Sequence, residues 1–331
     1  MSARISKGTW DLDLWKIAIH TSSQAADAVC VMLETLGAIA TDVEDRLDVE
    51  MKKNHLQFGE LLDDSHLDAP LEGAVVSGYL DRAKFDESQA DDFVLQLRRE
   101  LDQLQTFGLD PGSLLIAREP LDEDDYLNVW KKDYHAFSVS NRLAIVPVWE
   151  RDVWRGPAGQ LPLWVEPGVA FGTGTHETTR LCLLELEALT TIGTRVLDVG
   201  TGTGILAIAA AKLGASRVVA VDLDDVAVRV ATSNVAENQV QDRVTVLHSD
   251  LNDAIAEEQF DVVTANLLAG LVIRLVPAIL RHLRPGGHLI ASGIVNSQWE
   301  SVKVVLEANQ FTITQVSRES DWLAIRARWD G

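Results

Sequence analysis

The chain has 331 residues, 47% of them hydrophobic, which is long for one domain and sufficient for two domains with sizeable cores. It contains no uncharged apolar stretch of about 18 residues, and its first residues form no apolar signal segment, so we expect no membrane span and, by default, a cytoplasmic location. The net charge of −21 argues against a direct nucleic acid partner, because phosphate binding needs a basic surface, and is compatible with a basic protein partner.

The acidic excess is concentrated in the first half of the chain. Residues 1–150 hold 14 Lys and Arg against 29 Asp and Glu, a net of −15, whereas residues 151–331 hold 15 against 21, a net of −6. Ordinary solvation explains such a surplus as well as attraction for a basic partner does.

Residues 1–120 show the hydrophobic periodicities of a small α+β domain. Apolar residues alternate in some segments and recur every three to four residues in others. The predicted elements are a strand at 15–21, a helix at 23–36, strands at 38–43 and 73–80, a helix at 88–107 and a strand at 113–118. This β-α-β-β-α-β order is typical of the ferredoxin-like fold, in which helices cover one face of the sheet and leave the other free for a partner. We expect this domain to recognise the substrate, and the acidic segment 44–70 to be a loop or insertion.

Residues 121–150 are predicted to link the two domains. An acidic run opens the segment, and the aromatic residues Tyr126, Trp130, Tyr134 and Phe137 follow it closely. Because a flexible connection rarely carries so many aromatic side chains, we expect this linker to pack against another part of the chain.

From residue 151 to residue 331 the pattern changes to that of a parallel α/β sheet. Short β-branched runs such as VLDVG, VVAVD and FDVVTANL alternate with helical stretches at 204–213, 225–238 and 268–283. Nearly continuous apolar strands are typical of a parallel sheet covered by helices on both faces, and the last two apolar segments are predicted to form a closing hairpin. The chain is therefore predicted to be an α/β protein with a Rossmann-like domain at its C-terminal end.

A glycine-rich turn, GTGTG, follows the first of these strands and contains Gly200 and Gly202. Such glycines let the chain turn sharply and let a ligand approach the backbone, although they could also be plain turn residues. Asp222 ends the second strand, where a carboxylate can accept both ribose hydroxyls of an adenosine, and Asp250 after the third strand can reach the adenine edge. Because Ile205 replaces the last glycine of the dinucleotide fingerprint, the turn favours S-adenosylmethionine over a nicotinamide cofactor.

Two further segments flank this motif. Residues 166–179, rich in glycine and threonine, are predicted to close over the cofactor, with Thr179 near a helix start, where hydroxyls also cap amides. His176 is a candidate proton acceptor or a structural hydrogen-bonding residue. Asn266, the last residue of the strand FDVVTAN, lies where many amino-group methyltransferases carry an Asn-Pro-Pro-Tyr motif. Its oxygen could orient an amine, so we predict Asn266 as the catalytic residue, with a plain strand-end turn as the alternative.

Five segments of the chain resemble one known family. They are WKKDYHAF (130–137), EPGVAFGTGTHETTRLCL (166–183), VLDVGTGTGILAIAAAKLGA (196–215), ANLLAG (265–270) and SGIVNSQWESV (292–302). The chain is similar to the ribosomal protein L11 methyltransferase family. The resemblance implies a recognition domain joined to a class I methyltransferase domain, S-adenosylmethionine as cofactor, and methylation of lysine or N-terminal amines of a basic ribosomal protein. It also implies cofactor contacts at Thr179, Gly200, Asp222 and Asn266.

Other functions are compatible with parts of this pattern. The same scaffold serves methyltransferases of nucleic acids, small molecules and other proteins, and a non-catalytic adenosyl-ligand-binding ribosome factor would need the turn but not Asn266. No metal is predicted, because no Cys/His cluster has the spacing of metal ligands. Nothing in the sequence indicates an oligomer, so we expect a monomer.

Overall fold

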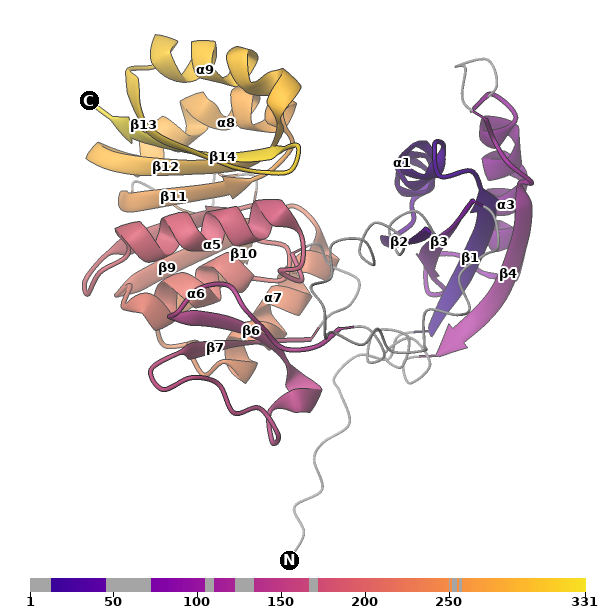
Figure 1. The fold of residues 1–331 in the computed structure, drawn as a ribbon, viewed down its shortest axis with the longest axis horizontal. Helices are drawn as coiled ribbons and strands as arrows, with labels where there is room; N and C mark the ends of the chain where they lie inside the picture. The colour runs from indigo at the N-terminus through magenta and orange to yellow at the C-terminus, as the bar shows by residue number, and fades with distance from the viewer. Residues whose placement is uncertain are drawn as a thin grey trace, which may run out of the picture. The chain divides into compact units, whose positions relative to one another are not determined.

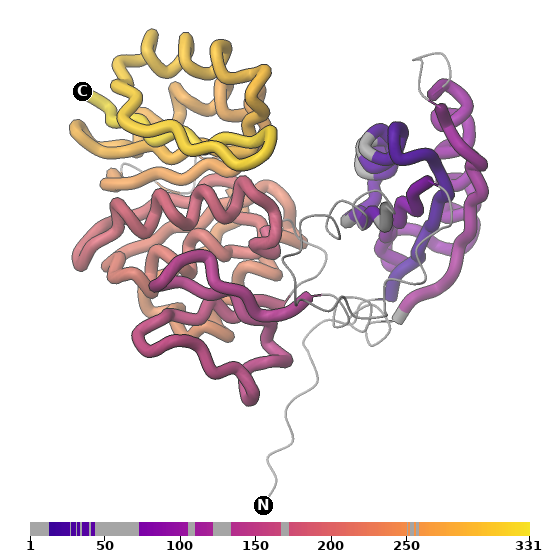
Figure 2. The backbone as a smooth tube through the Cα atoms, in the orientation of Figure 1, coloured from indigo at the N-terminus to yellow at the C-terminus, as the bar shows by residue number. Residues whose placement is uncertain are grey.

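The computed structural model describes residues 13–45, 73–104, 110–122, 134–166, 172–249, 251, 255 and 258–331. The chain divides into two compact units, Met1–Asp133 and Tyr134–Gly331, whose backbones can be followed in Figures 1 and 2. The second unit begins before the predicted boundary at 151, because residues 134–150 of the expected linker belong to it. Among the described residues, no helix combines the length and the apolar character needed to cross a membrane.

The described residues of the first unit form a four-stranded antiparallel sheet and two helices. Its elements are β1 (Asp13–Thr21), α1 (Ala26–Leu36), β2 (Ala40–Asp45), β3 (Ala74–Asp81), α3 (Glu87–Leu101) and β4 (Leu115–Asp122). The strand order is β2-β3-β1-β4, and every neighbouring pair is antiparallel. The described residues thus have the predicted β-α-β-β-α-β order, and the ferredoxin-like class stays our interpretation of it. Of the predicted insertion, residues 46–70 lie outside the described residues.

Alternation along β1 decides which side chains form the core of this unit. Trp15, Ile17 and Ile19 are buried on one face together with residues of α1 and α3, as the two-residue period of a strand requires. Leu14 points to the opposite face, as does Tyr79 of β3, and both are buried as well, at 0% and 1% exposure. On that face Lys16 and Ala18 are half-buried and His20 is exposed, and the expectation of a sheet face left free for a partner stays a prediction.

The second unit contains a seven-stranded sheet and a small three-stranded sheet. Its elements are β5 (Phe137–Ser138), β6 (Leu143–Pro147), η3 (Val148–Glu150), β7 (Leu161–Val165), α5 (Glu177–Leu189), β8 (Arg195–Val199), α6 (Ile205–Leu213), β9 (Arg217–Asp222), α7 (Asp225–Glu237), β10 (Val244–His248), β11 (Phe260–Asn266), α8 (Ala269–His282), β12 (Leu283–Val295), η4 (Asn296–Gln298), α9 (Trp299–Ala308), β13 (Phe311–Glu319) and β14 (Trp322–Trp329).

The large sheet has the order β10-β9-β8-β11-β12-β14-β13. The first five strands in this order are parallel, and β14 runs antiparallel to both of its neighbours. The order of strand addition reverses between β8 and β11. In open parallel sheets, ligands bind outside the carboxyl ends of the strands at such a reversal, so this edge is where a site is expected.

Helices cover both faces of the large sheet (Figure 1). Alternate residues of β8 serve opposite faces: Val196 packs in a cluster with residues of α5 and α6, whereas Leu197 packs in a cluster with residues of α8 and α9. This burial on two sides explains why the strands are continuous apolar runs in the sequence. The predicted parallel sheet and its closing hairpin, β13 and β14, are confirmed.

The aromatic segment of the expected linker packs into the second unit where it is described. Tyr134 is 4% exposed and lies edge-on to Trp149, with ring centroids 6.2 Å apart, and Phe137 packs against the same core cluster. Burial raises the pKa of Tyr134. Tyr126 and Trp130 lie outside the described residues. The predicted packing of the segment is thus confirmed for its last two aromatic residues.

Candidate active site

The glycine-rich turn connects the end of β8 to the start of α6. Gly200, Gly202 and Gly204 have φ angles of 69°, 54° and 81°, in the left-handed region that favours glycine. A Cβ atom at Gly200 would lie 2.5 Å from Cδ2 of Leu267, and one at Gly204 would lie 3.1 Å from Cβ of Ala231. The turn conformation therefore favours glycine at all three positions, and the close approach of neighbouring segments also requires it at Gly200 and Gly204.

Asp222 lies at the end of β9, in contact with this turn. Its Oδ2 accepts a hydrogen bond from the N–H of Gly202 at 2.9 Å, and its Oδ1 accepts one from the N–H of Asp224 at 3.1 Å. Two backbone donors thus hold the carboxylate in place, and each oxygen keeps a lone pair that a ligand hydroxyl could use. This contact brings the turn and the carboxylate, 20 residues apart in the chain, together at the carboxyl edge of the sheet.

Asp198 is buried within β8 and connects the turn to β11. The hydroxyl of Thr201 donates to its Oδ2 at 2.6 Å, and the hydroxyl of Thr264 donates to its Oδ1 at 2.5 Å. Burial raises the pKa of Asp198, and the two hydroxyl donors oppose that shift because they stabilise the carboxylate. The carboxylate therefore ties together two segments that both end at the candidate site.

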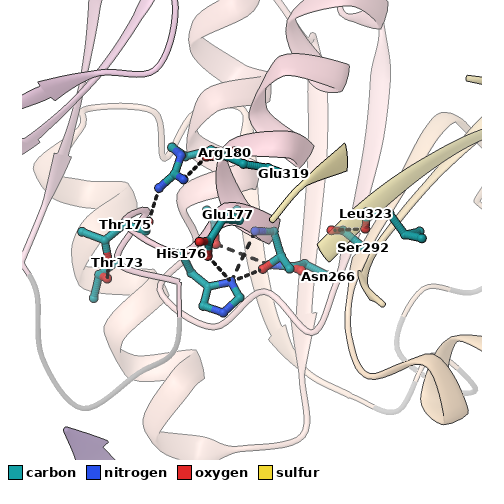
Figure 3. A network of polar contacts seen from close by, with 11 residues as sticks. Thr173, Thr175, His176, Glu177, Arg180, Asn266, Ser292, Glu319 and Leu323 are labelled. Atoms are coloured by element: carbon teal, nitrogen blue, oxygen red, sulfur yellow. Dashed lines mark hydrogen bonds and ion pairs between the residues drawn. The ribbon is translucent and has the colours of Figure 1, made fainter. Parts of the chain in front are cut away.

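Asn266 is the last residue of β11 and lies beside the start of α5 (Figure 3). Its Nδ2 donates to Oγ1 of Thr179 at 3.4 Å. Its Oδ1 is buried and has no hydrogen-bond partner among the described residues. A buried acceptor without a donor costs about 1–3 kcal/mol. Such an atom at the ligand-binding edge of a parallel sheet is a candidate acceptor for a ligand donor.

His176 caps the start of α5. Its Nδ1 accepts hydrogen bonds from the N–H of Thr178 at 3.3 Å and from the Thr178 hydroxyl at 2.9 Å. Its ring lies edge-on to Trp322, with centroids 4.9 Å apart. Burial lowers the pKa of His176; Glu177 opposes this shift and Arg180 reinforces it. The cap requires an unprotonated Nδ1, so the structural role that the sequence left open for this histidine is present.

Acidic side chains surround this edge of the sheet. The one arginine in the first turn of α5, Arg180, is paired with Glu319 of β13 (Figure 3). Carboxylates gathered at the starts of helices and the end of β9 favour a cationic ligand over an anionic one. They are Glu177, Asp222, Asp224 and Asp225.

The structure brings most of the predicted site residues to one edge. Asp250 lies outside the described residues, as do residues 167–171 of the loop that is predicted to close over the cofactor. The described end of that loop is attached to the turn, because the hydroxyl of Thr203 donates to the carbonyl of Gly172 at 2.6 Å. The predicted residues found at this edge are Thr179, Gly200, Gly202, Asp222 and Asn266.

Trp322 and Thr264 are among the residues of this edge that were not predicted from the sequence, as are Asp198 and Thr201. Trp322 reaches it only because β14 runs antiparallel beside β12, which brings its first residue to the carboxyl edge. Thr264 is a hydroxyl residue inside an apolar strand, and this is the one sequence signal that could have drawn attention to it.

These features define the class of the protein. A seven-stranded sheet of this order with an antiparallel β14, a glycine turn after β8 and a carboxylate at the end of β9 are those of a Rossmann-like class I methyltransferase. The chain belongs to the ribosomal protein L11 methyltransferase family, because the model of that family, PrmA, matches residues 13–329.

Relatives match nearly the whole chain. A ribosomal protein L11 methyltransferase of Brevibacillus brevis is 43% identical over 313 residues, which cover 95% of this chain and 98% of the relative. One of Limosilactobacillus fermentum is 39% identical over 313 residues, covering 94% and 96%. The crystal structure of a ribosomal protein L11 methylase from Lactobacillus delbrueckii subsp. bulgaricus, 37% identical, matches with a TM-score of 0.55 over 59% of this chain and 100% of that one. The predicted family, fold class and enzyme type are confirmed.

Proposed function

We propose that this chain transfers methyl groups from S-adenosylmethionine to lysine or N-terminal amines of ribosomal protein L11. The observation that carries the proposal is the buried Oδ1 of Asn266, which lacks a hydrogen-bond partner among the described residues. An amine about to be methylated needs its N–H groups held so that its lone pair points at the methyl group, and an amide oxygen can accept one of them.

The chemistry of the turn fits S-adenosylmethionine. Asp222 has lone pairs left for two ribose hydroxyls, and the acidic rim suits a ligand that carries a sulfonium. When bound, this cofactor supplies an activated methyl group. The residues proposed to hold it are Thr179, Gly200, Gly202, Asp222, Asp250 and Asn266.

The target amine must be neutral before it can attack. For a lysine with a pKa of about 10.4, neutralisation at pH 7 costs roughly 4.6 kcal/mol. Desolvation beside Asn266 disfavours the ammonium form and offsets part of this cost. The proton passes to water, because His176 uses its unprotonated Nδ1 for the cap of α5 and keeps its proton on Nε2. Asn266 then acts by orientation, with no strong base required.

The first unit is proposed to recognise the protein substrate. Residues 1–150, which include it, carry a net charge of −15, and this charge complements a basic ribosomal protein. Deleting residues 1–133 is expected to abolish transfer to the protein while the dissociation constant for S-adenosylmethionine, which also reports folding of the second unit, stays unchanged. Full transfer by the shortened chain would contradict this role.

A methyl-transfer assay tests the function directly. The full chain is incubated with methyl-labelled S-adenosylmethionine and, separately, with unmethylated ribosomal protein L11, another basic protein of similar size, and ribosomal RNA. We expect label on L11 alone, located by mass spectrometry on lysine or N-terminal nitrogens. Label on RNA or equally on both proteins would favour the alternative substrates, and binding of the cofactor without any transfer would favour a binding factor.

We further propose that the enzyme works as a monomer in the cytoplasm without direct contact to nucleic acid. Size-exclusion chromatography with light scattering tests the first part, and titration of the enzyme with ribosomal RNA at physiological salt tests the last. A stable dimer or tight RNA binding would contradict these expectations.

A further inference from the structure

Thr264 and Asn266 lie on one face of β11, separated by a single residue. Side chains two positions apart in a strand point to the same side of the sheet. In this case the side is the one covered by α5, because Asn266 meets Thr179 of that helix. Thr264 is 0% exposed, and its hydroxyl already donates to a side chain of the neighbouring strand. We therefore ask what this hydroxyl does through that partner.

The partner of Thr264 is Asp198 of the neighbouring strand. The two residues are directly opposite each other in the pairing of β11 with β8, and the Thr264 hydroxyl donates to Oδ1 of Asp198 at 2.5 Å. The other oxygen of the same carboxylate accepts from Thr201 inside the glycine-rich turn at 2.6 Å. One buried carboxylate thus joins the turn and the strand that carries Asn266.

An apolar contact forms a second connection on the far side of Asn266. The side chain of Leu267 lies against Gly200, where a Cβ atom would be 2.5 Å from its Cδ2. Leu267 also donates its N–H to the carbonyl of Ser292 at 3.0 Å, and a Cβ at Gly293 would lie 2.5 Å from the Leu267 carbonyl oxygen. The residues on either side of Asn266 therefore both connect to the glycine-rich turn, which we call the cofactor turn. Thr264 does so through hydrogen bonds to Asp198, and Leu267 does so by packing against Gly200.

We propose that Thr264 is a positioning residue for methyl transfer, which, through the carboxylate of Asp198, keeps Asn266 in register with the cofactor turn. The inference rests on the proposed function, because it concerns the alignment of the acceptor residue with the cofactor. A shift of about 1 Å between reacting groups can lower a rate 100-fold without any loss of ligand binding. Loss of the Thr264 hydroxyl should therefore reduce kcat and leave the affinity for the cofactor nearly unchanged, since Asp198 keeps its hydrogen bond from Thr201.

Three substitutions at one position separate the hydroxyl from the shape of the side chain. Thr264→Val keeps the shape and removes the donor, Thr264→Ser keeps the donor, and Thr264→Cys matches the serine variant in size but has only a weak donor. If the valine variant does not fold, the cysteine variant keeps the test informative. Thermal unfolding reports whether each variant folds. The readouts are kcat at saturating L11 and cofactor, and the dissociation constant for S-adenosylmethionine by calorimetry.

We expect kcat to fall about tenfold or more in the valine and cysteine variants, to stay within about twofold in the serine variant, and cofactor affinity to change by less than about threefold in all. Equal loss in the serine and cysteine variants, an unchanged kcat in the cysteine variant, or a loss of affinity as large as the loss of kcat would each overturn the inference. The wild-type chain distinguishes the two levels of failure. If it transfers no methyl group to L11, the proposed function is wrong and the inference falls with it, whereas equal transfer by wild type and the cysteine variant contradicts only the role of Thr264.

A double variant shows whether Thr264 acts through Asn266. When Asn266→Ala has already removed the acceptor, adding Thr264→Cys should lower kcat by less than about twofold further, because the effects of residues acting as one unit are not additive. A further loss as large as in the single variant would mean that Thr264 acts by another route, and would overturn the proposal.

Discussion

The candidate site has a turn side, which contains Asp198 and Asp222, and an acceptor side, which contains Asn266. The two sides satisfy their polar groups in different ways. On the turn side, Asp222 accepts hydrogen bonds from two backbone N–H groups, and Asp198 accepts from two hydroxyls. On the acceptor side, Asn266 makes one long contact through Nδ2 and leaves its buried Oδ1 without a partner among the described residues. Among the described residues, the carboxylates of the turn side are thus hydrogen-bonded, whereas the acceptor side leaves one oxygen that the proposed function assigns to the amine.

This difference predicts that substitutions on the two sides affect cofactor binding and turnover separately. Substitutions on the turn side break existing hydrogen bonds and should appear in cofactor affinity and stability. Substitutions on the acceptor side remove a group whose desolvation is offset only when the substrate binds. Their effect should therefore be mainly on kcat.

The largest expected effect is that of Asn266→Ala. Loss of the Asn266 amide oxygen should lower kcat on the order of 100-fold. The dissociation constant for S-adenosylmethionine should rise far less, and the thermal midpoint should not fall, because the buried unpaired oxygen is removed as well. Steady-state kinetics measures kcat, and calorimetry measures the dissociation constant. The control is Asn309→Ala, at the end of α9, which should leave kcat and the dissociation constant unchanged. An unchanged kcat would remove the catalytic role of Asn266.

Asp222→Ala should show the opposite signature on the turn side. The loss of charge-assisted hydrogen bonds to ligand hydroxyls is expected to weaken cofactor binding by about 30-fold, equivalent to ~2 kcal/mol. At saturating cofactor, kcat should recover to near the wild-type value. Asp225→Ala removes an exposed carboxylate at the start of α7 and is the matched control. If both variants weakened the cofactor equally, general electrostatics rather than a direct contact would explain the effect.

Thr179 connects the acceptor side to α5, and its substitution should have an intermediate effect. Thr179→Val removes the hydroxyl that meets Nδ2 of Asn266, which frees the amide to rotate, so kcat should fall about fivefold to tenfold. Thr179→Ser keeps the hydroxyl and should retain most of the activity. Because the 3.4 Å contact is long, a fall as large as that of Asn266→Ala would mean that Thr179 itself contacts the reacting groups.

The smallest expected effect is the pH dependence of the cap of α5. Burial lowers the pKa of His176, so the unfolded chain takes up its proton more readily than the folded chain does. The stability from this cap is therefore complete above the unfolded pKa of about 6.5 and declines as the pH falls toward the lower pKa of the folded state. Protonation at Nδ1 also removes the acceptor for the N–H of Thr178.

The comparison with His176→Asn measures this contribution. Asparagine is a good capping residue that does not titrate, so thermal unfolding of the variant between pH 7 and pH 5 should decline less than that of wild type, by about 1 kcal/mol at most. His288, whose pKa burial and neighbouring arginines also lower, is retained in both proteins and cancels in the comparison. Identical pH profiles would show that His176 does not titrate in this range.

Much of the site followed from local sequence patterns, and the exceptions have physical reasons. The turn at Gly200 and the carboxylate of Asp222 were predicted because a strand end and a glycine motif are local features. The cap at His176 was left open between two roles, because histidine is not among the usual capping residues and only the position of its Nδ1 decides. Residues 134–150, which the sequence places in a linker, belong to the second unit, because Tyr134, Leu143 and Ile145 are buried in its core.

The sequence by itself determined the order of the elements, the two-sided burial of the parallel strands and the identity of the cofactor turn, because periodicity and turn chemistry act over a few residues. The tertiary structure alone decided which distant residues meet. Thr264 reaches Asp198 across 66 positions and Asn266 reaches Thr179 across 87. Strand order and register set these contacts, and both depend on how complete sheets and helices pack rather than on residues nearby in the chain.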